Sequence, residues 1–92
     1  MIVKIGDIEF DNVSYYEDGD VLYLWVGTPR RPASDDASPE GHYLQFGENG
    51  ELIALTIVNA RWILEREGKI VVTLPDGSRL ETTDLGPALA AA

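Results

Sequence analysis

Cysteine is absent from this 92-residue chain, and histidine occurs once, at His42. Without cysteine, the chain can form no disulfide, no thiolate metal site and no cysteine nucleophile. A serine triad needs a histidine and an acid placed beside a serine, and no arrangement of the single histidine with the scattered serines matches such a signature. The composition therefore predicts a protein that is not an enzyme. His42 is left as the one side chain whose ordinary pKa, ~6.5, lies near neutrality, so it is a candidate pH-sensitive or ligand-binding residue.

Basic residues are few: seven Lys and Arg face sixteen Asp and Glu, which leaves a net charge of -9. Residues 7–20 hold six acids and residues 35–51 hold five, and neither stretch contains a base. Such a surface repels nucleic-acid backbones and anionic lipids, so we expect no nucleic-acid partner. The acids serve either as a solvated surface that keeps a small domain soluble or as a docking face for a small basic protein.

Long apolar runs and phosphate-binding glycine loops are also missing. No segment approaches the ~18 apolar residues of a membrane span, so we expect a cytoplasmic protein without a membrane partner. Neither GxGxxG nor GxxxxGK[ST] occurs. Asp18 and Asp20 resemble the start of a calcium loop, but Val21 and Leu22 stand where further oxygen ligands are needed. The sequence therefore predicts no cofactor and no metal site.

What the chain does contain is a series of strand, turn and strand patterns. Gly6-Asp7, the acidic segment 17–20, Asn49-Gly50 within 47–51, and the segment 75–77 are all typical hairpin turns. They predict four antiparallel hairpins, which pair residues 1–5 with 8–10, 13–16 with 21–26, 42–46 with 52–58, and 69–74 with 78–82.

The segments between these hairpins are less regular. Residues 27–41 contain three prolines and no large apolar side chain, which predicts a long loop. Ala60, Ile63 and Leu64 have the spacing of one helical stripe, so a short helix is expected over 60–67. Asn59 would cap its start and Gly68 would take the left-handed position after its end, with a continued strand as the alternative. Residues 83–92 are expected to be a frayed tail.

Together these elements predict a single α+β domain over residues 1–92. Residues 1–58 form an antiparallel, hairpin-built sheet core, 59–68 a short helix, 69–82 a C-terminal hairpin and 83–92 a tail. The strands at 21–26 and 52–58 are apolar on both faces, which one short helix cannot cover. The second cover is either the C-terminal hairpin or another subunit. We therefore expect a homodimer, with Tyr23, Trp25, Leu55 and Ile57 at or near its interface.

The segment from Val13 to Ala60 resembles the family known as domain of unknown function 2283. The similarity lies in YEDGDVLYL at 16–24, EG at 40–41, FGENGELI at 46–53 and IVNA at 57–60. Two departures are Phe46-Gly47, where the family usually has an Asp-Tyr step, and about thirty further residues that add a hairpin. The resemblance implies a fold rather than an activity, and it implies an antitoxin-like role because such domains are encoded near small candidate toxins.

The leading functional hypothesis is a small, acidic, non-catalytic interaction module, antitoxin-like and homodimeric. The alternative is a small-ligand-binding domain or minor enzyme with a pocket at the subunit interface, near His42 and the adjacent pair Arg30 and Arg31, which could hold a carboxylate or phosphate. A third hypothesis is a purely structural homo-oligomer.

Overall fold

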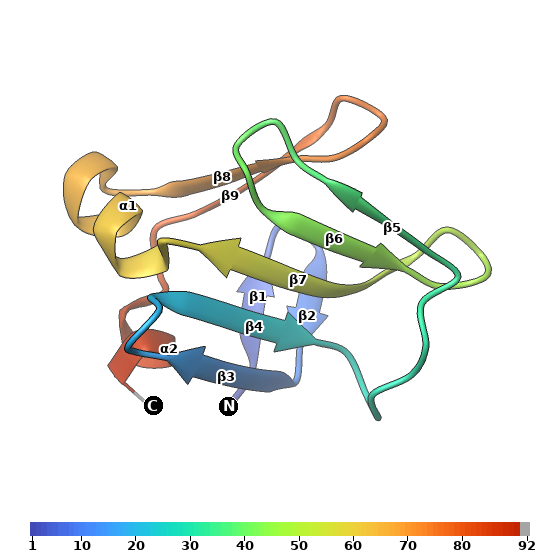
Figure 1. Cartoon of the computed structure of the whole chain (residues 1–92), viewed down its shortest axis with the longest axis horizontal. Coiled ribbons are helices and arrows are strands. Elements are labelled where there is room, and N and C mark those ends of the chain that lie inside the picture. The colour runs from blue at the N-terminus through green and yellow to red at the C-terminus, as the bar shows by residue number, and fades with distance from the viewer. Residues whose placement is uncertain (91–92) are drawn as a thin grey trace.

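The computed structural model describes residues 1–90, which form nine strands and two short helices (Figure 1). The strands are β1 (Val3–Ile5), β2 (Ile8–Phe10), β3 (Asn12–Tyr16), β4 (Val21–Trp25), β5 (Ser34–Ala37), β6 (Tyr43–Phe46), β7 (Leu52–Val58), β8 (Ile70–Thr73) and β9 (Arg79–Thr82). The helices are α1 (Ala60–Glu67) and α2 (Gly86–Ala90). The predicted α+β fold of antiparallel hairpins with a helix over 60–67 is confirmed.

A five-stranded antiparallel sheet is the centre of the fold, with the order β3-β4-β7-β6-β5. Two of the predicted hairpins, β3-β4 and β6-β7, join through the pairing of β4 with β7, which places Leu22 opposite Ile57 and Leu24 opposite Leu55. The β1-β2 and β8-β9 hairpins remain separate two-stranded sheets. Local turns thus produce four hairpins, and one long-range pairing fuses two of them.

One face of the central sheet is covered by the rest of the chain. The β1-β2 hairpin crosses behind the sheet in Figure 1, and α2 packs beside β3. Apolar side chains from all these elements form one buried cluster, in which Phe10, Leu22, Ile57, Ile70 and Leu85 are each 0% exposed. Burying a side chain of this size stabilises the fold by ~1.5–3 kcal/mol, so this face anchors the domain.

The opposite face of the sheet carries no second layer. Within residues 1–90, no helix or hairpin lies in front of β4 and β7 in Figure 1, and α1 sits at the end of the sheet. Because side chains alternate along a strand, Tyr23 and Trp25 of β4 face outward while Leu22 and Leu24 face the core. The predicted need for a second cover is therefore not met by the C-terminal hairpin, which does not shield this face.

Two segments expected to be irregular are ordered. The loop predicted over 27–41 contains β5, which pairs with β6 from Ser34 opposite Phe46 to Ala37 opposite Tyr43. The tail predicted to fray contains α2, with Leu85 0%, Ala88 1% and Leu89 6% exposed. Pairing and burial outweigh the weak local propensities of both segments.

The start of α1 also differs from the prediction. Asn59 adopts a left-handed conformation, φ 59°, and its side chain makes no capping hydrogen bond. A capping residue normally has an extended backbone, so Asn59 cannot fill that role. The predicted end is confirmed, because Gly68 is left-handed and its N–H donates to the Leu64 carbonyl. None of the helices within residues 1–90 is long and apolar enough to cross a membrane.

Candidate functional site

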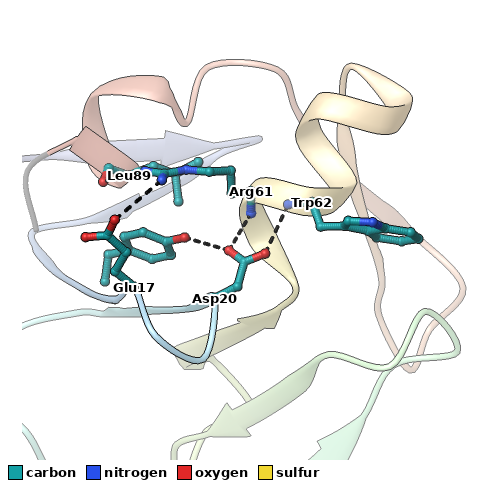
Figure 2. Close-up of polar contacts among 6 residues, drawn as sticks. Glu17, Asp20, Arg61, Trp62 and Leu89 are labelled. Atoms are coloured by element: carbon teal, nitrogen blue, oxygen red, sulfur yellow. Dashed lines mark hydrogen bonds and ion pairs between the residues drawn. The ribbon is translucent and has the colours of Figure 1, made fainter.

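The most densely hydrogen-bonded side chain is that of Asp20, at the end of the β3-β4 turn (Figure 2). Its Oδ1 accepts hydrogen bonds from the Tyr15 hydroxyl at 2.6 Å and the Arg61 N–H at 2.8 Å, and its Oδ2 accepts one from the Trp62 N–H at 3.0 Å. Its backbone carbonyl accepts the Ala60 N–H at 3.1 Å. Asp20 therefore caps α1 from across the fold, in the place predicted for Asn59.

Charge around Asp20 reinforces this cap. Burial alone would raise the pKa of Asp20, but the hydrogen bonds from Tyr15, Arg61 and Trp62, together with the Arg61 charge, hold it below its ordinary value. Burial and the hydrogen bond to Asp20 raise the pKa of Tyr15 to about 12. At neutral pH, Asp20 is therefore a carboxylate and Tyr15 an un-ionised phenol, and the two are hydrogen-bonded to each other.

Arg61 closes the cluster on its other side. Its guanidinium lies 5.3 Å from the centre of the Tyr15 ring, its Nη2 donates to the Leu89 carbonyl at 3.4 Å, and its Nη1 lies 3.9 Å from Glu17 Oε1. The Glu17 carboxylate is exposed, so that ion pair contributes little. The cluster holds β3, α1 and α2 together, so its role is structural. We call it the clamp.

His42 belongs to a second structural corner. It is 1% exposed, its Nδ1 accepts the Val58 N–H at 3.1 Å, and its own N–H donates to Ser38 Oγ at 3.1 Å. Burial lowers the pKa of His42, although the nearby Glu40 charge works against that shift. An Nδ1 that accepts a hydrogen bond carries no proton, so His42 is neutral and holds the end of β7 in place.

Glu40 fastens this corner to the C-terminal hairpin. Its carboxylate accepts the Thr73 N–H at 2.9 Å and the Thr73 hydroxyl at 2.5 Å. Burial by itself would raise the pKa of Glu40, but these bonds to Thr73 lower it to about 2. Within residues 1–90, no group of three or more His, Asp or Glu side chains is arranged to hold a metal ion.

The open face of the central sheet is a surface without an evident structural role. The registers align Ser14, Tyr23, Thr56, Tyr43 and Ala37 in one row across all five strands. Tyr16, Tyr23 and Tyr43 are 55%, 41% and 57% exposed. We call this surface, made of the outward-facing residues of β3 to β7, the tyrosine face.

A hollow of about 380 Å³ lies on the tyrosine face, between the strands and the segment after β4. Trp25, Ala54, Thr56 and Gln45 contribute from the sheet, and Thr28, Pro29 and Arg30 contribute from the segment after β4. Arg30 pairs with Glu51 at 3.3 Å, and both side chains are exposed. The Trp25 Nε1 is buried and has no hydrogen-bond partner among the described residues.

Comparison with known proteins assigns the chain to a family. The model of the family described as protein of unknown function (DUF2283) matches residues 12–61, which is just over half of the chain. The chain belongs to the DUF2283 family. No curated protein and no solved structure matches it.

The DUF2283 segment contains both the clamp and the tyrosine face. It begins at β3 and ends in the first turn of α1, so it includes Asp20 and Arg61 as well as all five strands of the central sheet. The β1-β2 hairpin, β8, β9 and α2, which line the covered face, lie outside it. In this DUF2283 protein, the elements outside residues 12–61 therefore cover one face of the central sheet and leave the opposite face exposed.

The residues predicted to lie at the subunit interface fall into two groups in the structure. Tyr23 and Trp25 lie on the tyrosine face, whereas Leu55 and Ile57 are 1% and 0% exposed on the covered face. Leu55 and Ile57 therefore cannot form a subunit contact in this fold. The error arose because strand alternation shows which residues share a face but not which faces of β4 and β7 coincide.

The expected ligand-binding residues are also separated. Arg30 lines the hollow, Arg31 lines only a smaller depression with Glu48 and Glu51, and His42 lines neither. The roles of Asp20 and Glu40 were missed, because their partners follow 41 and 33 residues later in the sequence. No local pattern marks them, although the acidic turn that holds Asp20 is visible in the sequence.

Proposed function

We propose that this DUF2283 protein is a non-catalytic interaction module that acts as a homodimer through its tyrosine face. The observation that carries the proposal is a sheet face rich in exposed tyrosine and poor in charge. Of the outward-facing residues on the rows through Tyr23 and Trp25, only Asp35, at the β5 edge, is charged. Aromatic enrichment with charge depletion is typical of interface cores.

A second copy is a suitable occupant despite the net charge of -9. Apart from Asp35 at the β5 edge, no acid lies on the rows through Tyr23 and Trp25, so two tyrosine faces can meet without bringing carboxylates together at the centre. Repulsion between the peripheral acids is screened over ~8 Å at physiological salt. Covering the exposed tyrosines supplies the apolar burial that drives association.

The non-catalytic part of the proposal rests on how the ionisable groups are used. Asp20 and Glu40 accept hydrogen bonds that keep them ionised, and His42 is neutral and buried. A general acid or base must exchange protons with a substrate near neutral pH. The hydrogen bonds of these groups instead hold elements of the fold together.

Size-exclusion chromatography with light scattering tests the dimer. We expect a mass twice that of the 10.1 kDa chain at micromolar concentration. The double substitution Tyr23→Ser and Tyr43→Ser should give a folded monomer. Trp62→Ser is the matched control, because Trp62 is as exposed, at 55%, but lies on α1. A wild-type monomer, or equal dissociation by the control, would contradict the proposal.

We also propose a small basic protein as a second partner, in keeping with an antitoxin-like role. The supporting observation is the acidic edge strand β5, where Asp35 and Asp36 are exposed and take part in no ion pair between described residues. Capture from native lysate should recover a basic protein whose binding weakens with salt. Asp35→Asn with Asp36→Asn should abolish capture, while Asp7→Asn with Glu9→Gln, which removes the same charge from the first hairpin, should preserve it.

A further inference from the structure

We propose that the hollow beside Trp25 is a binding site for a small planar apolar molecule that carries one carboxylate. This inference does not depend on the partner proteins proposed above, because it rests on the shape and charge of one protomer. The proposed ligand is a small molecule rather than a macromolecule.

The size and lining of the hollow indicate which ring system the ligand carries. Its volume of about 380 Å³ lies within the ~300–1,000 Å³ range of small-molecule pockets. Trp25, Val26, Pro29 and Ala54 supply apolar lining. A hollow lined by an indole ring, a proline and a sheet surface favours a planar ring system, which can stack and bury apolar area.

The charge of the residues that line the hollow indicates which functional group the ligand carries. The protein has more than twice as many acids as bases, yet no Asp or Glu lines this hollow, and Arg30 is its one charged residue. A guanidinium recognises a carboxylate through paired N–H donors. An amine would find no carboxylate in the lining, and a multiply charged phosphate would meet the repulsion of the surrounding acids.

Arg30 can exchange its present partner for such a ligand. Its contact with Glu51 is 3.3 Å long, and the two side chains are 53% and 43% exposed. Exposed pairs of this kind contribute little, because water and salt screen them. A ligand carboxylate that is partly shielded inside the hollow can therefore compete with Glu51 for the guanidinium.

Trp25 provides a second reason to expect an oxygen-bearing ligand. Its Nε1 is a donor only, and it is buried with no acceptor among residues 1–90. A buried donor left without an acceptor is unfavourable. In the free protein Nε1 is not exposed to the hollow, so the proposal requires that a bound ligand oxygen reach it and supply the missing acceptor.

The hollow also shares Tyr23 and Trp25 with the tyrosine face. A second copy on that face and a ligand in the hollow therefore influence each other. Ligand affinity must be measured at a protein concentration where one oligomeric state dominates, as established by light scattering in the same buffer. A failure to bind ligand and a failure to dimerise are then separate results.

The probe pair is 2-naphthoate and the uncharged 2-naphthamide, which share one ring system. Titrations follow Trp25 fluorescence in a Trp62→Phe background, supported by calorimetry. We expect weak, saturable binding of 2-naphthoate with a Kd of about 1 mM, since the affinity of a ligand is bounded by its number of heavy atoms. 2-Naphthamide should bind about 10-fold more weakly, because it lacks the negative charge that pairs with the Arg30 guanidinium.

Two matched pairs of variants locate the site. Arg30→Gln should weaken 2-naphthoate about 10-fold and leave 2-naphthamide unchanged, whereas Arg31→Gln, which removes the same charge one residue away, should change neither by more than about 2-fold. Ala54→Met should fill the hollow and abolish binding, while Ala37→Met adds the same side chain to β5, outside the hollow.

The proposal is overturned by any of three results. One is the absence of saturable binding by 2-naphthoate with the folded protein. Another is equal binding of the acid and the amide, which would remove the role of Arg30. The third is an equal effect of Arg30→Gln and Arg31→Gln, which would mean that net charge rather than the hollow attracts the anion.

Discussion

The Asp20 carboxylate accepts the backbone N–H of Arg61 at 2.8 Å, although 41 residues separate them. This hydrogen bond joins the acidic turn of the β3-β4 hairpin to the first turn of α1. A helix of eight residues is too short to be stable alone. Its position at the end of the sheet therefore depends on a cap supplied by a different hairpin.

Replacing Asp20 should destabilise the whole domain. Asp20→Ala leaves the Tyr15 hydroxyl and two helix N–H groups without their acceptor, so we expect a loss of about 2 kcal/mol in the free energy of unfolding. Urea denaturation followed by circular dichroism measures this loss. Asp18→Ala, an exposed change in the same turn, should shift stability by less than about 0.5 kcal/mol; equal losses would contradict the cap.

Tyr15 should be visible as a late-titrating phenol. Its folded pKa is raised to about 12 from 10.0, so the stability it provides is complete below pH 10.0 and is lost as pH rises towards about 12. Absorbance at 295 nm of the wild type minus Tyr15→Phe should show one phenolate forming with a midpoint near pH 12. A difference midpoint near pH 10.0 would show that the contact with Asp20 is absent in solution.

His42 should make the domain sensitive to mild acid. Its pKa is lowered by burial, so its contribution is complete above the ordinary value of 6.5 and is lost as pH falls below it. Protonation of Nδ1 also removes the acceptor of the Val58 N–H. Between pH 7 and pH 5, the urea midpoint of the wild type should fall more steeply than that of His42→Asn, which keeps an acceptor but does not titrate. Parallel slopes would exclude this role.

Glu40 should act over a more acidic range. Its pKa is lowered to about 2 from 4.5, so its bonds to Thr73 stabilise the fold fully above pH 4.5 and are lost as pH falls towards about 2. The wild type should be more stable than Glu40→Gln at pH 5, and the difference should vanish near pH 2. Glu48→Gln, an exposed change in the β6-β7 turn, is the control and should show no such trend.

Leu85 tests whether the C-terminal segment is part of the core. Leu85 is 0% exposed, and Leu85→Ala should cost ~2–5 kcal/mol in unfolding free energy. Val26→Ala, at a position 38% exposed, should cost less than about 1 kcal/mol. A loss below about 0.5 kcal/mol for Leu85→Ala would favour the frayed tail expected from the sequence.

The sequence predicts what is local in this fold. Asn49-Gly50 and the segment after Leu74 specify turns by their own backbone preferences, and the alternation of apolar residues fixes which side chains share a face of one strand. The helix after Asn59 follows from the spacing of its apolar residues. Each of these signals lies within about ten residues of the structure that it predicts.

What the sequence does not predict depends on contacts between distant segments. The Ser-Asp-Asp-Ala stretch of β5 has no residue favoured in strands and is extended because β6 pairs with it. The short α2 forms because the core covers Leu85 and Leu89. The tyrosine face becomes recognisable only once the pairing of β4 with β7 decides which apolar residues remain outside.

The acidic edge strand has a consequence for how large an assembly can become. A strand at the edge of a sheet has free backbone groups that invite pairing with the same edge of another molecule. In β5, Asp35 and Asp36 would bring like charges together across such a pairing, and like charges placed opposite each other oppose it. End-to-end growth of the sheet into a fibre is thereby discouraged on this side, so contact through a face can end in a closed pair of molecules.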